Sequence, residues 1–141
     1  MLLSAIVLTG RIINSSAVAR AGNASEPGDG GIVATATDFT LFMDALMKRR
    51  LISDSSVREM VRGKTTEAIY GLGVQLFFHY GNERQYGHLG AELGAASLLL
   101  FYARSRISLY LEFNADNSFN GRIPDLMDQC KEEIAQVLAK E

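Results

Sequence analysis

Residues 95–113 read AASLLLFYARSRISLYLEF and predict two adjacent strands. The first part, residues 95–103, is a continuous apolar run that is typical of a central strand. The RSR at 104–106 predicts a turn. Residues 107–113 then alternate between apolar and polar side chains, which is the two-residue period of an amphipathic strand. We therefore expect two neighbouring antiparallel strands at the centre of the fold.

Earlier residues predict at least one more strand pair. Two sets of side chains alternate along the segment LGVQLFFH, which predicts a half-buried strand. The first set is Leu72, Val74, Leu76 and Phe78, and the second is Gly73, Gln75, Phe77 and His79. The GNER at 81–84 predicts a turn, and the segment beginning QYG at Gln85 returns as the next strand. The expected sheet is an antiparallel meander of at least three strands.

A helix is expected after a polar, glycine-rich loop at residues 20–31. Thr35 and Asp38 have the spacing of a capping box. Apolar side chains then recur at helical intervals, and the basic run at 48–50 suits a helix C-terminus. The predicted apolar positions of this helix are Leu41, Phe42, Ala45 and Leu46.

Two more helices complete the expected α+β fold, in which helices pack on an antiparallel sheet. A short one runs from about Ser53 to Val61, with Ser56 and Glu59 at capping-box spacing. The last helix has Pro124 in its first turn. Its predicted apolar face holds Leu126, Met127, Cys130, Ile134, Val137 and Leu138, while Lys131, Glu132, Glu133 and Gln136 lie mostly off that face. This position makes Cys130 a core thiol rather than a nucleophile.

Composition indicates one globular domain. The chain has 141 residues, of which 48% are hydrophobic and 21% are charged. A net charge of -2 gives no electrostatic reason to expect nucleic acid or an anionic membrane as a partner. A single cysteine cannot form an internal disulfide, so it leaves the redox compartment open.

The first residues, MLLSAIVLTG, are apolar but too short to span a bilayer. They fit either a secretory h-region, with AVA at 17–19 as a cleavage site, or a first strand or core segment. No basic residue precedes the apolar run, and Arg11 follows it closely, which favours the second interpretation. The compartment is therefore left open.

Three blocks of sequence carry a resemblance to a known family: GDGGIVATATDFTLFMDALM (28–47), YGLGVQ (70–75) and YGHLGAELGAASLLLF (86–101). In this order and spacing they resemble the C-terminal half of the serine β-lactamase-like family. This family comprises class C β-lactamases, D-alanyl-D-alanine carboxypeptidases and related esterases. The resemblance implies a partial β-lactamase-like domain at residues 22–141, preceded by an apolar segment at 1–21.

The family joins three motifs in its active site: Ser-x-x-Lys with the nucleophile and a basic lysine, Tyr-x-Asn, and Lys/His-x-Gly on a strand. The third motif maps onto His88, Leu89 and Gly90, which the resemblance makes the substrate-binding residues. A donor at His88 would orient a carboxylate or polarise the nucleophile's surroundings. Gly90 would let the substrate lie along the strand, where the backbone can stabilise an oxyanion. The alternative is a hairpin histidine without a role.

The sequence departs from the family pattern in two ways. Leu89 stands where the lactamases and peptidases often have a Ser or Thr hydroxyl that binds a substrate carboxylate, which points toward esterase-like or unknown substrates. No serine has a lysine three residues after it. Tyr80-Gly81-Asn82 spells Tyr-x-Asn, but it falls in the predicted hairpin turn, where Gly and Asn are ordinary turn residues.

Without nucleophile and base, covalent acyl transfer lacks its first step. The leading hypothesis is a truncated serine β-lactamase-like domain that is inactive alone, with no catalytic residue assigned. An alternative is a serine hydrolase that acts on ester or amide substrates when complemented. A second is an interaction module that associates with itself or with a complementary half-domain through faces left uncovered. A third is an enzyme with another nucleophile, Ser97 or Cys130, neither of which has a nearby base in the sequence.

No cofactor or metal is expected. His79 and His88 are the only histidines, and no Cys or acidic residue accompanies them at ligand spacing. The GDGG at 28–31 lacks the lysine of a phosphate-binding loop. The aromatic residues are scattered through predicted strands without a basic stripe, which excludes a base-stacking platform.

Overall fold

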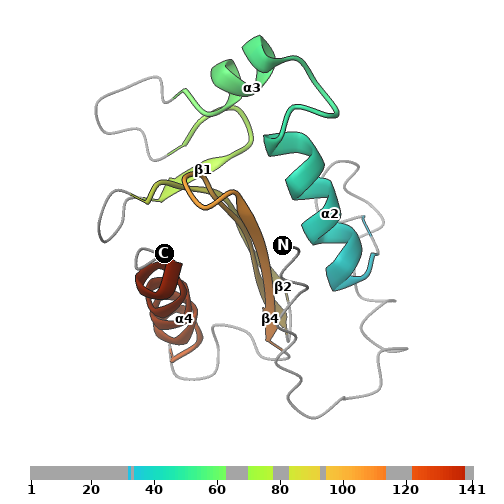
Figure 1. Ribbon diagram of the computed structural model, residues 1–141. Helices are drawn as coiled ribbons and strands as arrows, with labels where there is room; N and C mark the ends of the chain where they lie inside the picture. The colour runs from blue at the N-terminus through green and yellow to red at the C-terminus, as the bar shows by residue number, and fades with distance from the viewer. Residues whose placement is uncertain are drawn as a thin grey trace.

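The computed structural model describes residues 32, 34–62, 70–77, 83–92, 95–113 and 122–138. In these residues four strands form one antiparallel sheet in the order β1-β2-β3-β4: β1 Gln75–Phe77, β2 Gln85–Glu92, β3 Ala95–Tyr102 and β4 Ile107–Phe113. Three helices accompany them: α2 Ala36–Met47, α3 Asp54–Met60 and α4 Arg122–Leu138. Figure 1 shows α2 on one face of the sheet and α4 on the other. The predicted α+β class is confirmed.

Strand β3 lies inside the sheet, as its continuous apolar sequence predicts. Its even-numbered side chains, such as Leu98 and Leu100, are buried in a core that includes Met127 of α4. Its odd-numbered side chains Leu99 and Phe101 pack toward α2. Each fully buried leucine contributes about 1.5–3 kcal/mol of hydrophobic stabilisation, so covering both faces of this strand strongly favours the three-layer arrangement.

The predicted capping box of α2 is confirmed. The Asp38 amide donates to Thr35 Oγ1 over 3.2 Å, and the Thr35 amide donates to Asp38 Oδ2 over 3.1 Å. These two bonds satisfy backbone donors that have no partner within the helix. The pKa of Asp38 is lowered chiefly by the Thr35 hydroxyl, which donates to Asp38 Oδ2 over 2.7 Å, and then by the Thr35 amide.

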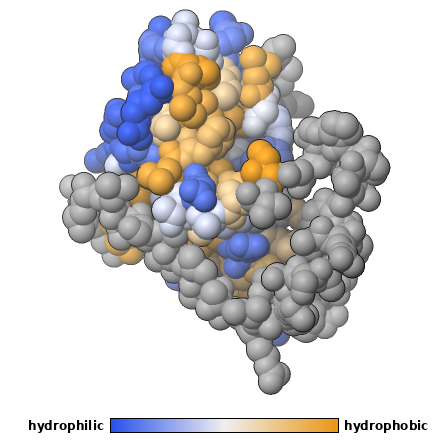
Figure 2. Space-filling view, turned by 90° about the vertical axis from the view of Figure 1, so that its right-hand side faces the viewer, coloured by the Kyte–Doolittle hydropathy of each residue, from blue (hydrophilic) through white to orange (hydrophobic). Residues whose placement is uncertain are grey.

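The buried face of α2 differs from the predicted one. Met43 and Met47 face the sheet and contact the cluster around Phe101. Leu41 and Phe42 are 48% and 52% exposed, because the packing of the two methionines turns them away from the core. The helix thus carries a second apolar stripe that faces outward. Figure 2 views the α2 side of the molecule and shows hydrophobic surface on it.

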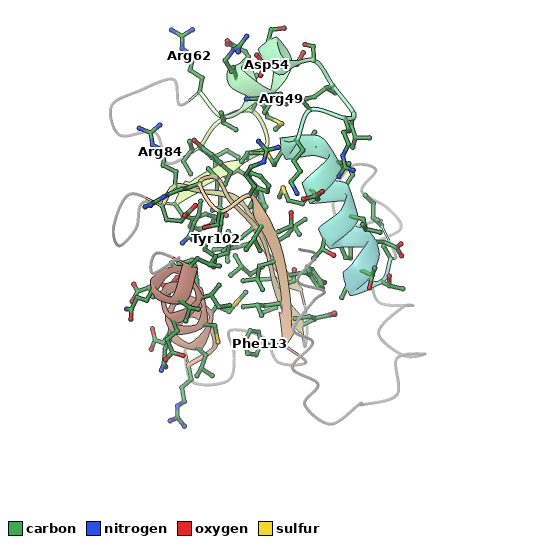
Figure 3. The ribbon with its side chains drawn as sticks, in the orientation of Figure 1. Arg49, Asp54, Arg62, Arg84, Tyr102 and Phe113 are labelled. Carbon is green, nitrogen blue, oxygen red and sulfur yellow. The ribbon has the colours of Figure 1, made fainter. Side chains whose placement is uncertain are left out.

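The second helix lies where it was expected, but its cap does not. Ser53 is the N-cap: its backbone is extended, with ψ at 157°, and its Oγ accepts from the Ser56 amide over 3.1 Å. The predicted Ser56–Glu59 capping box is wrong, because Ser56 lies inside the first turn that Ser53 already caps. Figure 3 shows Arg49 and Asp54 close together at this end of the molecule, where they form an ion pair.

The strand predicted at residues 72–79 begins later in the structure. Among the described residues of this segment, Gln75–Phe77 form β1, and Leu72 is exposed. Gly73 has a φ of 71°, a left-handed conformation that glycine adopts without strain, and it turns the chain before the strand begins. Phe78, His79 and the Tyr80-Gly81-Asn82 motif lie outside the described residues, as does the apolar segment 1–21.

Most of the predicted apolar face of α4 packs in the core: Met127 and Leu138 are buried, and Cys130 and Ile134 pack against the cluster. Three positions differ from the prediction. Leu126 and Val137 are 44% and 60% exposed, whereas Lys131 is buried. The Lys131 stem lies in the core, while its Nζ stands 4.9 Å from the Phe77 ring centroid and 2.5 Å from Asp128 Oδ1. A long aliphatic stem can cover apolar surface while its charge finds partners at the rim, which explains the difference.

Cys130 is half-buried and packs against the α4 core, as predicted for a core thiol. Figure 3 shows Tyr102 on the same side of the sheet, between β3 and α4. Its hydroxyl donates to the Lys131 carbonyl over 3.2 Å, which ties the helix to the strand. Of the helices described, none combines the length and the apolar character that crossing a bilayer requires.

Candidate functional site

The three predicted substrate-binding residues are consecutive on β2, and all three are exposed. His88 pairs with Leu99 and Gly90 pairs with Ser97, so both lie on the face of the sheet that α2 covers. Leu89 pairs with Leu98 and lies on the opposite face. Alternation along the strand therefore separates the histidine and the glycine from the leucine between them.

The outer edge of β2 is only partly covered. Strand β1 pairs with residues 85–87 and with none of the later β2 residues. Beyond Gly87, the Leu89 amide points to this edge and donates to Gln75 Oε1 over 2.9 Å. A side-chain oxygen therefore accepts the hydrogen bond that a neighbouring strand would otherwise accept. Because backbone groups alternate in direction along a strand, Ala91 faces the same edge as Leu89. Within the described residues, no strand pairs with β2 at Ala91 on this side.

The His88 ring is engaged at both nitrogens. Its Nε2 contacts the hydroxyl of Tyr70, and its Nδ1 contacts the backbone carbonyl of Leu89. The two rings meet edge to face, with centroids 5.5 Å apart and planes at 82°. These contacts fix the orientation of the imidazole beside the open edge.

Tyr70 and Gln75 come from one tight hairpin, residues 70–75, which we call the Tyr70 hairpin. Its two end residues form an isolated antiparallel bridge, and the Leu72 amide donates to the Met60 carbonyl over 2.8 Å. A Cβ at position 71 would lie 2.0 Å from the same carbonyl oxygen, so only glycine allows this approach. The end of α3 therefore holds the hairpin against β2.

A second polar group lies on the α2 face beside Gly90. A Cβ at Gly90 would lie 2.5 Å from Ser97 Oγ, so the absent side chain leaves that hydroxyl room. Tyr110 hydrogen-bonds to Ser97 and to Glu112, and its ring stacks on Phe39 with centroids 4.9 Å apart. Burial, followed by the charge of Glu112, raises the pKa of Tyr110 to about 12.

These positions bear on the two alternative nucleophiles. Cys130 packs in the α4 core, on the other side of the sheet from His88. Ser97 lies on the same side as His88, but its hydroxyl partner Tyr110 stays protonated at neutral pH and accepts no proton from it. Ser97 does pair across the strands with Glu112, a carboxylate on the same face, whereas Cys130 lies away from His88 in the α4 core.

Sequence reasoning did not assign a role to Tyr70 or Gln75. The block YGLGVQ carries part of the family resemblance, but its alternating pattern predicted the start of a strand instead of a hairpin. The two glycines, Gly71 and Gly73, were the available signal, because isolated glycines in a strand pattern often mark a bend or a close backbone approach.

A metal centre has no support in the described residues, where no three His, Cys, Asp or Glu side chains lie close enough to share an ion. His79, the other histidine that a metal pair would need, falls outside those residues. The site therefore consists of a strand edge, an oriented imidazole and the Tyr70 hairpin.

Comparisons with known proteins bear on the fold. No protein-family model matches this chain, and no curated protein matches it. A solved structure of a D-stereospecific amidohydrolase from Streptomyces sp. does match, at 31% sequence identity with a TM-score of 0.50. The match covers 56% of this chain and 25% of that one, so the chain spans about a quarter of the solved protein's length. The chain is thus structurally similar, over part of its length, to an amidohydrolase of the β-lactamase-like fold.

Proposed function

We propose that this chain supplies the substrate-binding strand of a β-lactamase-like hydrolase that acts on amide or ester bonds. In this proposal the acyl part of the substrate lies along β2 beside His88, Leu89 and Gly90. The attacking serine and its lysine lie outside these 141 residues, since no Ser-x-x-Lys occurs in them. The likeness to an amidohydrolase supports the amide class.

The observation that carries the proposal is the partly open edge of β2. An extended ligand can pair with an exposed strand through main-chain hydrogen bonds, and side-chain pockets then set its specificity. Ala91 faces that edge with no strand beside it in the described residues. Gly90 keeps the adjoining face clear, which allows the close approach that an acyl group requires.

Complementation tests this function. The chain would be mixed with a separate polypeptide carrying the Ser-x-x-Lys helix of a β-lactamase-like amidohydrolase, and a D-amino acid p-nitroanilide would report hydrolysis. We expect turnover by the mixture, no turnover by either part, and loss of turnover with Gly90→Leu. A covalent acyl adduct on the isolated chain, detected by intact mass, would refute the proposal that the nucleophile lies outside these residues.

A second candidate function is association through the outward stripe of α2. Leu41 and Phe42 are about half exposed on adjacent positions of one helix, and clustered exposed apolar side chains favour protein contacts. The partner in this proposal is either a second copy or the complementary half-domain. Light scattering of the chain with and without the complementing polypeptide separates these two cases.

A further inference from the structure

We propose that Tyr70 is a positioning residue for His88, and that the resulting site accepts an uncharged acyl ligand rather than a carboxylate. This inference rests on the proposed function, because it names the ligand class of the same edge. It begins from the contact between the Tyr70 hydroxyl and His88 Nε2. Tyr70 lies outside the His-x-Gly motif, eighteen residues earlier in the chain.

The other ring nitrogen decides which way the hydrogens point. A carbonyl oxygen can only accept, so His88 Nδ1 carries the hydrogen in its contact with Leu89. In the neutral ring Nε2 then bears a lone pair, and the Tyr70 hydroxyl donates to it. The Leu89 carbonyl therefore selects the tautomer, and the Tyr70 hydroxyl stabilises that tautomer and holds the ring in one orientation.

The consequence concerns charge recognition. With Nδ1 donating within the chain and Nε2 accepting from Tyr70, the neutral imidazole has no N–H left for an anionic ligand. The middle position of the motif, Leu89, offers no hydroxyl either. Beside the imidazole, the oxygen of Tyr70 is an acceptor suited to an amide N–H, and the Ala91 amide on the open edge is a donor that an uncharged acyl oxygen can use. A carboxylate next to His88 would find no N–H or hydroxyl donor among the motif side chains to replace its hydration.

Gln75 limits where such a ligand can pair. The Gln75 side chain accepts the hydrogen bond of the Leu89 amide, and β1 pairs with the preceding part of the edge, residues 85–87. An extended ligand that lies beside the motif can therefore pair with the backbone at Ala91, but not with the Leu89 amide while Gln75 stays in place. The same hairpin thus positions the imidazole and sets the start of the binding edge.

The first test reads the tautomer directly. Nitrogen-15 correlation spectra distinguish a ring nitrogen that carries hydrogen from one with a lone pair, and His88→Gln identifies the His88 signals against those of His79. We expect the hydrogen on Nδ1 in the wild-type chain and a mixture of tautomers in Tyr70→Phe. Tyr86→Phe removes a hydroxyl two residues from His88 and should leave the spectrum unchanged. A wild-type hydrogen on Nε2, or no change in Tyr70→Phe, would overturn the positioning role.

The second test compares N-acetyl-D-phenylalanine methylamide with N-acetyl-D-phenylalanine, which differ in charge at one end. Backbone amide shifts of Gly90 and Ala91 report binding to the whole chain. We expect the neutral ligand to bind roughly tenfold more tightly, the factor for one net hydrogen bond, and Tyr70→Phe to reduce this preference. Equal or tighter binding of the anion would overturn the ligand class.

The two proposals fail differently. If neither ligand shifts the β2 amides while His88 shows the expected tautomer, the substrate edge and its ligand class are wrong and Tyr70 retains only its role in orienting the ring. If both ligands bind but the tautomer is the other one, the edge stands and the positioning role of Tyr70 falls.

Discussion

A Cβ atom at position 87 would lie 1.9 Å from the carbonyl oxygen of Leu99, so β2 and β3 approach each other in a way that only glycine allows at Gly87. Backbone atoms cannot rotate away as a side chain does. We therefore expect Gly87→Ala to lower the free energy of unfolding by about 2 kcal/mol or more, measured by urea denaturation. Gly90→Ala is the matched control on the same strand, because its Cβ would meet the rotatable hydroxyl of Ser97 and cost about 1 kcal/mol or less. Equal losses in the two variants would contradict this explanation.

Lys131 should stabilise the fold mainly through its stem. The side chain is buried, with Nζ near the Phe77 ring and Asp128. Lys131→Ala should lower the free energy of unfolding by about 1–2 kcal/mol, while Lys131→Met, which keeps the methylene length, should retain most of it. Thermal and urea unfolding of both variants measure the difference. A loss in Lys131→Met as large as that in Lys131→Ala would show that the charge matters more than the stem.

The α2 cap links stability to the titration of Asp38. Thr35→Ala removes an acceptor and a donor, and it should cost about 1 kcal/mol of stability. The same change should return the Asp38 pKa toward its ordinary value, because Thr35 supplies the hydrogen bonds that lower it. The folded pKa is depressed, so this stabilisation is present at neutral pH and is lost as the pH falls through the folded value. Carboxyl NMR titration of both chains checks the shift, and an unchanged Asp38 pKa in the variant would exclude Thr35 as its cause.

Alkaline pH should weaken the fold through Tyr110. Its folded pKa of about 12 exceeds the unfolded value of about 10, so the folded state binds the proton more tightly. The stabilisation is complete below about pH 10 and declines as the pH rises toward 12. We expect Tyr110→Phe to make the unfolding free energy less dependent on pH in this window. Urea denaturation at a series of pH values measures it, and identical slopes in the two chains would count against Tyr110.

The outward stripe of α2 should control association. Phe42→Glu places a charge at the most exposed of its apolar positions and should shift the chain toward monomer in light scattering. Met43→Leu is a volume-matched change on the buried face of the same helix and should leave the oligomeric state unaltered. A wild-type chain that is monomeric at every concentration would remove self-association and leave only the complementary half-domain as partner.

Periodicity predicted the elements better than it predicted which of their faces pack. The apolar run of β3 and the alternation of β4 identified the sheet, since these patterns are local. The helix α2 has apolar side chains at Leu41 and Phe42 as well as at Met43 and Met47, and only the position of the sheet decides which pair is buried. In α4 the charge of Lys131 led to the prediction that it lies off the core, whereas its apolar stem allows it to be buried.

The candidate site shows the same division. The His-x-Gly residues could be located from the sequence, because the motif is contiguous and follows a recognisable strand pattern. The partners of His88 could not be located from the sequence. The Tyr70 hairpin reaches β2 because the chain turns at Gly73 and because the Leu72 amide bonds to the Met60 carbonyl, and a sequence pattern does not record that tertiary contact. Side chains that meet across eighteen residues leave no spacing that a linear pattern records.

The carbonyl of Met60, which ends α3, anchors the hairpin that serves the neighbouring strand. Selection can therefore retune the surroundings of His88 by altering a short surface helix while every residue of β2 stays the same. Engineering of ligand preference in this chain can begin there, at a distance from the motif itself.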